Sequence, residues 1–155
     1  MTGGARLLAV ILVLMPVAAG AAHADYSGWR SCAPCHEKSA EGWRTTRHSK
    51  ALDSLAAEKK ERNRTCLPCH TTGFGEPGGF LDIDITPELV GVQCESCHGP
   101  AGSHLANPEQ KKPATSPKES VCRKCHTPGQ DSAFDYKSMS SAVHGAVKAV
   151  EPPGR

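Results

Sequence analysis

Apolar positions along the chain concentrate in a short leader and are sparse after it. Residues 7–17 form an apolar run that is too short to span a bilayer comfortably. Arg6 precedes this run and Ala22-His23-Ala24 follows it, an arrangement typical of a secretory signal with a small-residue cleavage site. We therefore expect residues 1–24 to be a signal peptide removed after Ala24, with export to the periplasm, and residues 25–155 to form one domain. An uncleaved membrane anchor is the alternative for the leader.

Beyond the leader, the pattern predicts short helices separated by loops. Alanine and leucine favour a helix over residues 48–63, and residues 138–150 are the last helical candidate. Ser116 followed by Pro117 is typical of a helix start, with serine as the cap and proline at the first position. Residues 80–85 alternate apolar and polar side chains after a glycine-rich stretch, which predicts a short strand.

The apolar content after the leader is small for a single domain. Much of the 38% hydrophobic composition lies in the leader and in the eight cysteines. Such a chain would struggle to bury a peptide core of adequate size, so bound groups are expected to supply much of the core. The formal net charge of +2 gives no indication of nucleic-acid binding, and we expect no nucleic-acid partner.

All eight cysteines fall in four motifs of one spacing, Cys-x-x-Cys-His, the pattern by which a c-type haem is attached to a chain. Two thiols bond to the haem, and the histidine that follows becomes the proximal iron ligand. Positions i, i+3 and i+4 share one face of a helical turn, so the three side chains can meet one porphyrin together. We therefore expect four haem c groups, held by Cys32, Cys35 and His36; by Cys66, Cys69 and His70; by Cys94, Cys97 and His98; and by Cys122, Cys125 and His126.

Zinc is the alternative for the cysteine pairs, because tetrathiolate zinc sites also use Cys-x-x-Cys. A histidine follows every pair here, although an all-cysteine zinc site needs none. No thiol is left over, and free dithiols in an exported protein would tend to oxidise. The sequence therefore favours haem.

Three further histidines are available for the second axial position of the irons. Once His23 is removed with the leader, three histidines remain in addition to the four of the motifs: His48, His104 and His144. We expect them to be distal ligands, which would give low-spin irons suited to electron transfer; the alternative for each is a surface or propionate-bonded histidine. Four bis-histidine haems need eight histidines, and residues 25–155 contain seven, so one axial position is filled otherwise or left open.

With these motifs, the chain resembles the tetrahaem cytochrome c-554 family of periplasmic electron carriers. The resemblance implies a mainly α, small multihaem cytochrome c, with short helices and long loops wrapped around four stacked c-type haems. It implies three bis-histidine haems and a second haem that lacks a distal protein ligand. The resemblance rests on His48-Ser49-Lys50-Ala51, on Cys69-His70-Thr71-Thr72-Gly73-Phe74, and above all on Gly91-Val92-Gln93-Cys94-Glu95-Ser96-Cys97-His98-Gly99-Pro100 followed by His104.

The same resemblance implies a crossed assignment of the distal histidines. The distance that the chain can span agrees with this assignment, because His104 lies only six residues after His98 and would struggle to return to the opposite face of the same haem. The implied partners are His104 with the haem of His36, His144 with that of His98, and His48 with that of His126.

The haem of His70 is the candidate for the open position. The segment 71–93 contains no histidine or methionine, and apolar side chains around Phe74, Phe80 and Ile83 could cap an iron without ligating it. Met139 is the sole methionine after the leader and the alternative ligand. Its polar surroundings favour an ordinary packing or surface role.

We expect a periplasmic electron-transfer protein that works between periplasmic or membrane-bound redox partners, without a permanent anchor after cleavage. The alternative is an enzyme that reduces nitric oxide or a related nitrogen oxide at a five-coordinate haem. No pair of acid and base side chains indicates a catalytic site. We expect Glu95 to be exposed on its turn; the alternative is that its side chain is a polar group near a haem. A haem-based sensor is a third possibility, for which no output segment is visible.

The complete use of the cysteines predicts the mass of the exported protein. It should exceed that of the 131-residue chain Asp25–Arg155 by four haem masses, measured on the intact denatured protein. A mass that shows zinc or free thiols instead would contradict haem attachment.

Overall fold

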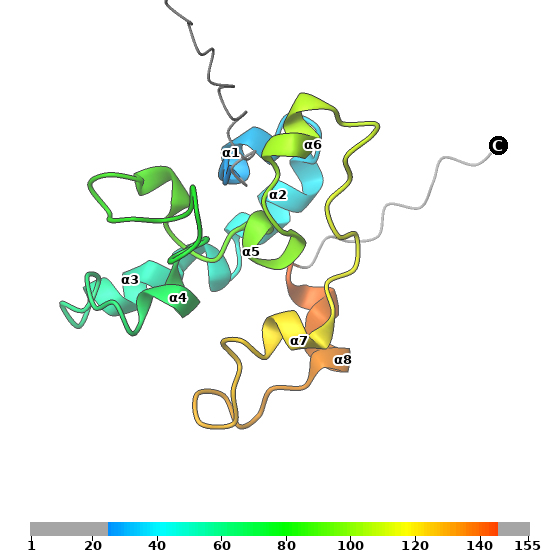
Figure 1. The fold of residues 1–155 in the computed structure, drawn as a ribbon. Helices are drawn as coiled ribbons and strands as arrows, with labels where there is room; N and C mark the ends of the chain where they lie inside the picture. The colour runs from blue at the N-terminus through cyan, green and yellow to red at the C-terminus, as the bar shows by residue number, and fades with distance from the viewer. Residues whose placement is uncertain (1–24, 146–155) are drawn as a thin grey trace, which may run out of the picture.

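The computed structural model describes residues 25–145 as a series of short helices joined by long turns (Figure 1). Within these residues there is no β-strand, and Thr71 and Val90 form an isolated antiparallel bridge. The mainly helical fold expected from the sequence is confirmed. The elements are α1 (Trp29–Cys32), α2 (Glu37–Arg44), η1 (His48–Lys50), α3 (Ala51–Ala56), α4 (Leu67–His70), η2 (Pro87–Leu89), α5 (Cys94–His98), α6 (Gly102–Ala106), α7 (Glu119–Cys122), α8 (Tyr136–Met139) and η3 (Ser140–Ala142).

The helix expected over residues 48–63 is shorter than its composition suggested. It consists of η1 and α3 and ends at Ala56, after which the chain turns through Lys59 at φ 56°. Leu52 and Leu55 are the buried residues of α3, whereas the residues that follow are polar and mostly exposed. A helix of this length depends on packing one face, so it ends where that face ends.

The strand expected over residues 80–85 is wrong, because the segment forms a turn. The Asp82 carboxylate accepts the backbone N–H of Asp84 at 3.0 Å, and its carbonyl accepts from Ile85 and Thr86. Side-chain bonds of this kind favour turns over strands. Arg62 pairs with Asp82 and Asp84, each at 2.6 Å, and holds the turn at the surface.

Helix α7 starts later than its sequence indicated, and the last helix is also different. Lys118, not Ser116, stands at the N-cap, and α7 begins at Glu119. The carbonyl of Pro117 accepts the Tyr136 hydroxyl at 2.8 Å, which ties this segment to α8 instead. The candidate over residues 138–150 begins with α8 and η3, and its part beyond residue 145 lies outside the described residues.

Glu95 is a buried carboxylate, 3% exposed, and the expectation that it lies exposed on its turn is wrong. Its oxygens accept the backbone N–H groups of Ser27 at 3.0 and 3.1 Å, of Gly28 at 2.8 Å and of Ala101 at 2.8 Å. Hydrogen bonds to an ionised acceptor are stronger than neutral ones and compensate the burial of the charge. The side chain thereby joins α5 to the segment before α1 and to the start of α6.

Gln93, at the N-cap of α5, continues this buried polar network. Its side-chain oxygen accepts the N–H of Trp29 at 2.6 Å, and its amide donates to the carbonyls of Glu88 and Val90 at 2.7 and 2.8 Å. Its backbone N–H donates to the hydroxyl of Thr72 at 3.0 Å. The chain around α5 is therefore held to α1, to η2 and to the segment that follows α4.

Gly91 lets η1 approach the entry to α5. It has φ 83°, and a Cβ atom there would lie 2.8 Å from the carbonyl oxygen of Ser49, so other residues would be strained. Beyond it, the N–H of Val92 donates to the His48 carbonyl at 2.9 Å, and the indole of Trp43 donates to the Val92 carbonyl at 2.8 Å.

A small apolar cluster joins α3, α4 and η2. Its five members are 1–8% exposed: Leu52, Leu55, Leu67, Phe80 and Leu89. Phe80 is therefore part of a peptide core, where the sequence suggested an iron-capping role. A cluster of five side chains is small for a chain of this length, in line with the expectation that the peptide alone cannot supply the core.

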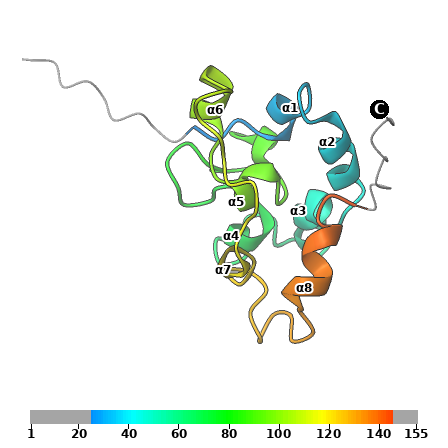
Figure 2. The ribbon, with the colours of Figure 1, turned by 90° about the vertical axis from the view of Figure 1, so that its right-hand side faces the viewer.

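Helix α5 lies near the centre of the ribbon in both views (Figures 1 and 2). Helix α6 lies at one end, and the loop between α7 and α8 lies at the opposite end. None of the helices within residues 25–145 has both the length and the apolar content needed to cross a bilayer.

The buried network predicts that Glu95→Gln destabilises the protein. The amide cannot accept at both atoms, so at least one buried backbone N–H loses its partner, at a cost of about 1–3 kcal/mol. The denaturant midpoint of the haem-loaded protein should fall. Glu119→Gln is the matched control, because its side chain is 49% exposed and pairs at the surface with Arg123. Equal midpoints for the two variants would contradict the role given to Glu95.

Candidate functional site

Each Cys-x-x-Cys-His motif forms a helical turn, but the helices are placed differently. The second and third motifs lie on α4 and α5. The first Cys of the other two motifs ends α1 and α7, and the turn continues through the N–H of His36 to the Cys32 carbonyl at 2.9 Å and of His126 to the Cys122 carbonyl at 3.0 Å. All four motifs thus have the i to i+4 geometry that brings their three side chains to one face.

The structure brings three of the motif histidines opposite the three further histidines. Within residues 25–145, His70 has no such partner ring. When two imidazoles bind one metal ion from opposite sides, each metal–nitrogen bond is about 2 Å long. Adding the distance from each nitrogen to the centre of its ring places the two ring centroids about 6 Å apart. The pairs are His36 and His104, with ring centroids 6.4 Å apart; His48 and His126, 5.9 Å apart; and His98 and His144, 6.0 Å apart with planes 9° from parallel.

Three motif histidines have their Nδ1 atoms engaged by oxygen. His70 bonds the carbonyl of Ala51 at 2.6 Å, His98 bonds the carbonyl of Ala114, and His126 bonds the Asp131 carboxylate at 2.8 Å. An oxygen acceptor requires the proton on Nδ1, which leaves the lone pair on Nε2. The three rings therefore present Nε2 to a metal, as histidine ligands do when a second group fixes their tautomer.

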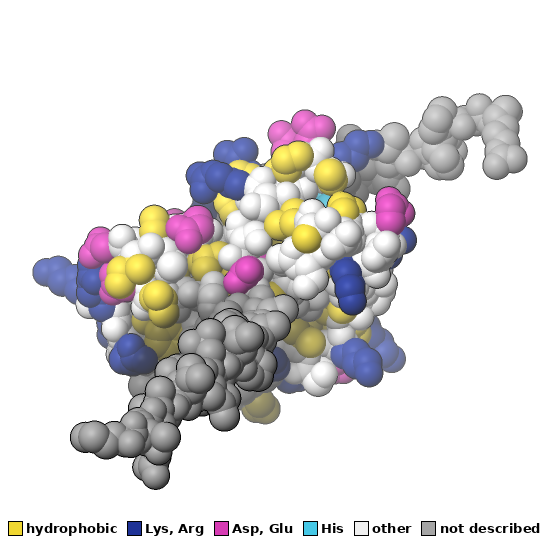
Figure 3. Space-filling model, turned by 45° about the horizontal axis from the view of Figure 1, so that its top comes forward, with side chains coloured by type: hydrophobic (Ala, Val, Ile, Leu, Met, Phe, Trp, Pro, Cys, Tyr) yellow, Lys and Arg dark blue, Asp and Glu magenta, His cyan; other side chains and the backbone are white. Residues whose placement is uncertain are grey.

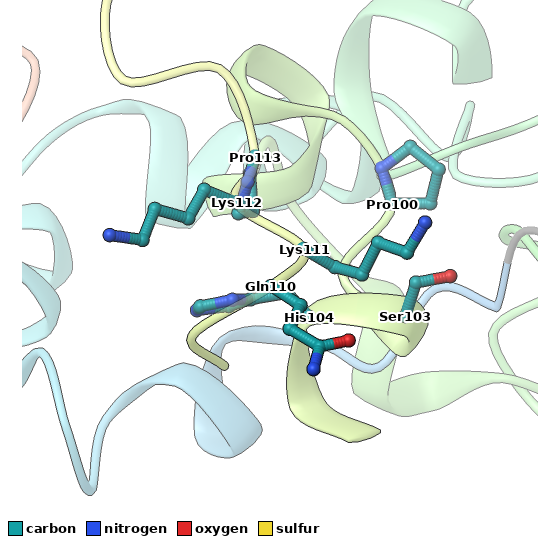
Figure 4. A pocket seen from close by; sticks show the side chains of 7 residues that line it. All are labelled: Pro100, Ser103, His104, Gln110, Lys111, Lys112 and Pro113. Atoms are coloured by element: carbon teal, nitrogen blue, oxygen red, sulfur yellow. The ribbon is translucent and has the colours of Figure 1, made fainter. Parts of the chain in front are cut away.

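His104 lies beside a cavity of about 310 Å³ at the end of the molecule formed by α6. Its Nδ1 atom is buried and has no hydrogen-bond partner among the described residues. Such an atom is costly unless a ligand satisfies it. Figure 4 shows His104 and Ser103 from α6 opposite the following loop; the lining residues are Pro100, Ser103, His104, Gln110, Lys111, Lys112 and Pro113.

Burial favours the neutral form of two of the paired histidines. Burial lowers the pKa of His48, and the nearby ring of His126 lowers it further. Burial and the ring of His98 act in the same direction on the pKa of His144. Neutral imidazole is the form that binds a metal.

Thiols of different motifs approach one another. A hydrogen bond between Cys32 and Cys94 raises the pKa of Cys32 and lowers that of Cys94. Burial and a hydrogen bond to Cys69 raise the pKa of Cys125 to about 12. Burial, followed by the thiol of Cys122, raises the pKa of Cys97. In space the motifs are therefore adjacent in the order first, third, fourth, second.

The remaining candidate ligand, Met139, ends α8 and is 41% exposed. Within residues 25–145, no three His, Cys, Asp or Glu side chains group around one point as a single bound ion requires. The donors instead come as opposed imidazole pairs and as cysteines spaced along helical turns. This donor set fits haem c, whose iron takes two axial nitrogens and whose periphery takes two thiols.

Comparison with known proteins agrees with this donor set. The family described as cytochrome c554 and c-prime matches residues 31–99. Cytochrome c-554 of Nitrosomonas europaea is 34% identical over 145 residues, covering 80% of this chain and 59% of that protein. The solved reduced state of cytochrome c554 from the same organism has a TM-score of 0.62 at 27% identity, covering 80% of this chain and 85% of the other. The chain belongs to the cytochrome c-554 family.

As a member of the cytochrome c-554 family, the chain is a multihaem cytochrome with haem c. The multiheme cytochrome MtrA of Shewanella baltica is also similar, at 32% identity over 76 residues that cover 40% of this chain and 22% of that protein. The chain spans 59% of the length of the Nitrosomonas cytochrome c-554.

Sequence reasoning missed the polar residues around the motifs. Asp131 and the carbonyls of Ala51 and Ala114 orient histidines, yet a carbonyl leaves no sequence signal. Glu95 carried one signal, since it is a charged residue within a motif that the structure places at the centre of the fold.

Proposed function

We propose that this protein carries electrons between redox partner proteins through four covalently bound haem c groups. The observation that carries the proposal is the set of three imidazole pairs with centroids 5.9–6.4 Å apart. Each pair combines a motif histidine with one from another part of the chain. Two opposed imidazoles occupy both axial positions of an iron and leave no site for a substrate, which suits electron transfer.

In this proposal, the chain's own residues hold the four groups in three ways. The paired cysteines bond the haem edges, and the motif histidines ligate through Nε2 because oxygen acceptors hold the proton on Nδ1 at His70, His98 and His126. His48, His104 and His144 are the distal ligands, and the buried unpartnered nitrogen of His104 supports this role. Bound haem supplies the one-electron chemistry.

The contacts between thiols support a chain of neighbouring attachment sites. Cys32 with Cys94, Cys97 with Cys122, and Cys125 with Cys69 link the motifs in the order first, third, fourth, second. Partners would then dock at the two ends of that series, at the first and second motifs. Lys and Arg side chains lie on several sides of the face in Figure 3, where they are available to an acidic partner or to haem propionates.

Export belongs to the same proposal. Residues 1–24 would act as a signal peptide, and residues 25–155 would work in the periplasm with soluble or membrane-bound partners. Thioether attachment suits that compartment, because it leaves no free dithiol to oxidise.

A second candidate function concerns His70. This motif histidine has no imidazole opposite it within residues 25–145, and Met139 is 41% exposed at the end of α8. We propose that its iron has an open position where nitric oxide or a related nitrogen oxide could be reduced. The carrier and enzyme functions differ at this one iron.

The crossed pairs predict the outcome of His104→Ala. One of the low-spin irons should become high-spin, because it loses an axial nitrogen, while covalent attachment keeps four haems on each chain. EPR of the oxidised protein measures the change. Ser103→Ala, on the same helix, is the matched control and should leave the spectrum unchanged. Unaltered low-spin signals in His104→Ala would show that His104 is not a ligand.

The open position predicts that the reduced protein binds carbon monoxide or nitric oxide at one iron in four. Spectrophotometric titration gives the stoichiometry, and Met139→Leu is the companion variant. If Met139 were the ligand, the wild type would bind none and the variant would gain a site. Binding without turnover of nitric oxide would support the carrier and contradict the reductase.

A further inference from the structure

His126 differs from the other motif histidines in the group that holds its ring. The Nδ1 atom lies 2.8 Å from Oδ2 of Asp131, with side chains 31% and 33% exposed. His70 and His98 bond neutral backbone carbonyls at the same atom. Among residues 25–145, the fourth motif is thus the one whose histidine is held by an anion.

The loop after this motif is built to keep the carboxylate in place. The N–H of Asp131 donates to the Thr127 carbonyl at 2.8 Å, and the N–H of Phe134 donates to the Asp131 carbonyl at 3.3 Å. The ring of Phe134 stacks on His126 at 4.4 Å with planes 21° apart. The imidazole is therefore held at its edge by Asp131 and on one face by Phe134.

Arg123 fastens the same loop without neutralising the carboxylate. Its guanidinium lies 4.7 Å from the centre of the Phe134 ring and 3.0 Å from Glu119, its ion-pair partner. It also donates to the carbonyl of Phe134 at 3.5 Å. Within the described residues, the ion pair recorded for Asp131 is with His126. The negative charge of Asp131 is thus directed at the imidazole.

We propose that Asp131 is a positioning residue that lowers the reduction potential of the haem bound by His126. The inference rests on the proposed ligation by this histidine. A carboxylate that accepts the Nδ1 proton makes the imidazole a stronger donor to its metal. Stronger donation and a nearby negative charge both stabilise the ferric state more than the ferrous state, and hydrogen bonding around an axial ligand is a recognised means of setting a potential.

The assignment distinguishes the fourth motif within the proposed series of sites. Its neighbours are the third motif, through Cys97 and Cys122, and the second, through Cys69 and Cys125. A low-potential site between them would make the step onto the fourth haem energetically uphill for an electron that moves toward the haem of His70, and would slow that passage.

The test is Asp131→Asn in the haem-loaded protein, followed by potentiometric titration of all four haems. One midpoint should move to higher potential, and the EPR signal of the same low-spin iron should change. The haem that moves should be the one that His48→Ala also alters, since His48 is the proposed distal partner. Asp131→Glu keeps the charge and should stay closer to the wild-type potential than Asp131→Asn does.

Glu119→Gln is the matched control, because it removes one negative charge close to the same motif without touching His126. It should leave the potential of that haem unchanged. An equal shift in Glu119→Gln, or equal shifts in Asp131→Asn and Asp131→Glu, would overturn the inference. If Asp131→Asn retains four haems and none of their potentials moves, the role given to Asp131 is overturned and the proposed function is not. A wild-type protein without haem would overturn the proposed function as well.

Discussion

The buried carboxylate of Glu95 is the interaction on which the arrangement of the helices depends. A charge at 3% exposure is tolerable only because three backbone N–H groups surround it, two from the distant segment before α1 and one from the start of α6. Those segments lead into α1 and α6, so the carboxylate sets where the first motif and His104 lie relative to the third motif. Apolar burial alone would not specify this arrangement, because it has no direction.

Helices of four to eight residues cannot be stable on their own propensity. The described part of the chain compensates with contacts between distant residues, such as Val92 with His48 and Gln93 with Trp29. The imidazole pairs add contacts of the same long range. If an iron joins each pair as proposed, metal binding and folding are linked, because ligand binding to the folded state stabilises it.

The four motifs are identical in spacing but not in surroundings, and this difference gives each site its own character. The Nδ1 atoms of three motif histidines meet two carbonyls and one carboxylate, and within residues 25–145 one motif histidine, His70, has no facing imidazole. A set of chemically equal sites would offer no direction to an electron. If the haems are bound as proposed, unequal second partners would give the irons different potentials without any change in the motif itself.

The sequence by itself determined the cofactor class, the residues of the four motifs, the family and the mainly helical fold. These depend on local chemistry: a thiol–thiol–imidazole spacing is readable because the three side chains belong to one helical turn. The count of histidines likewise predicts that one axial position differs from the others.

The tertiary structure alone decided that Glu95 is buried, that residues 80–85 form a turn, and that Asp131 meets His126. The pairing that the family resemblance implied needed coordinates, because His48 and His126 are far apart in sequence and meet at 5.9 Å. The local pattern could not predict the turn either, because the alternation of apolar and polar residues that begins at Phe80 also matches a strand. The turn forms because Phe80 is buried in the cluster with Leu52 and because the Asp82 side chain bonds the backbone. Contacts between distant residues result from the whole fold, and no short stretch of sequence encodes them.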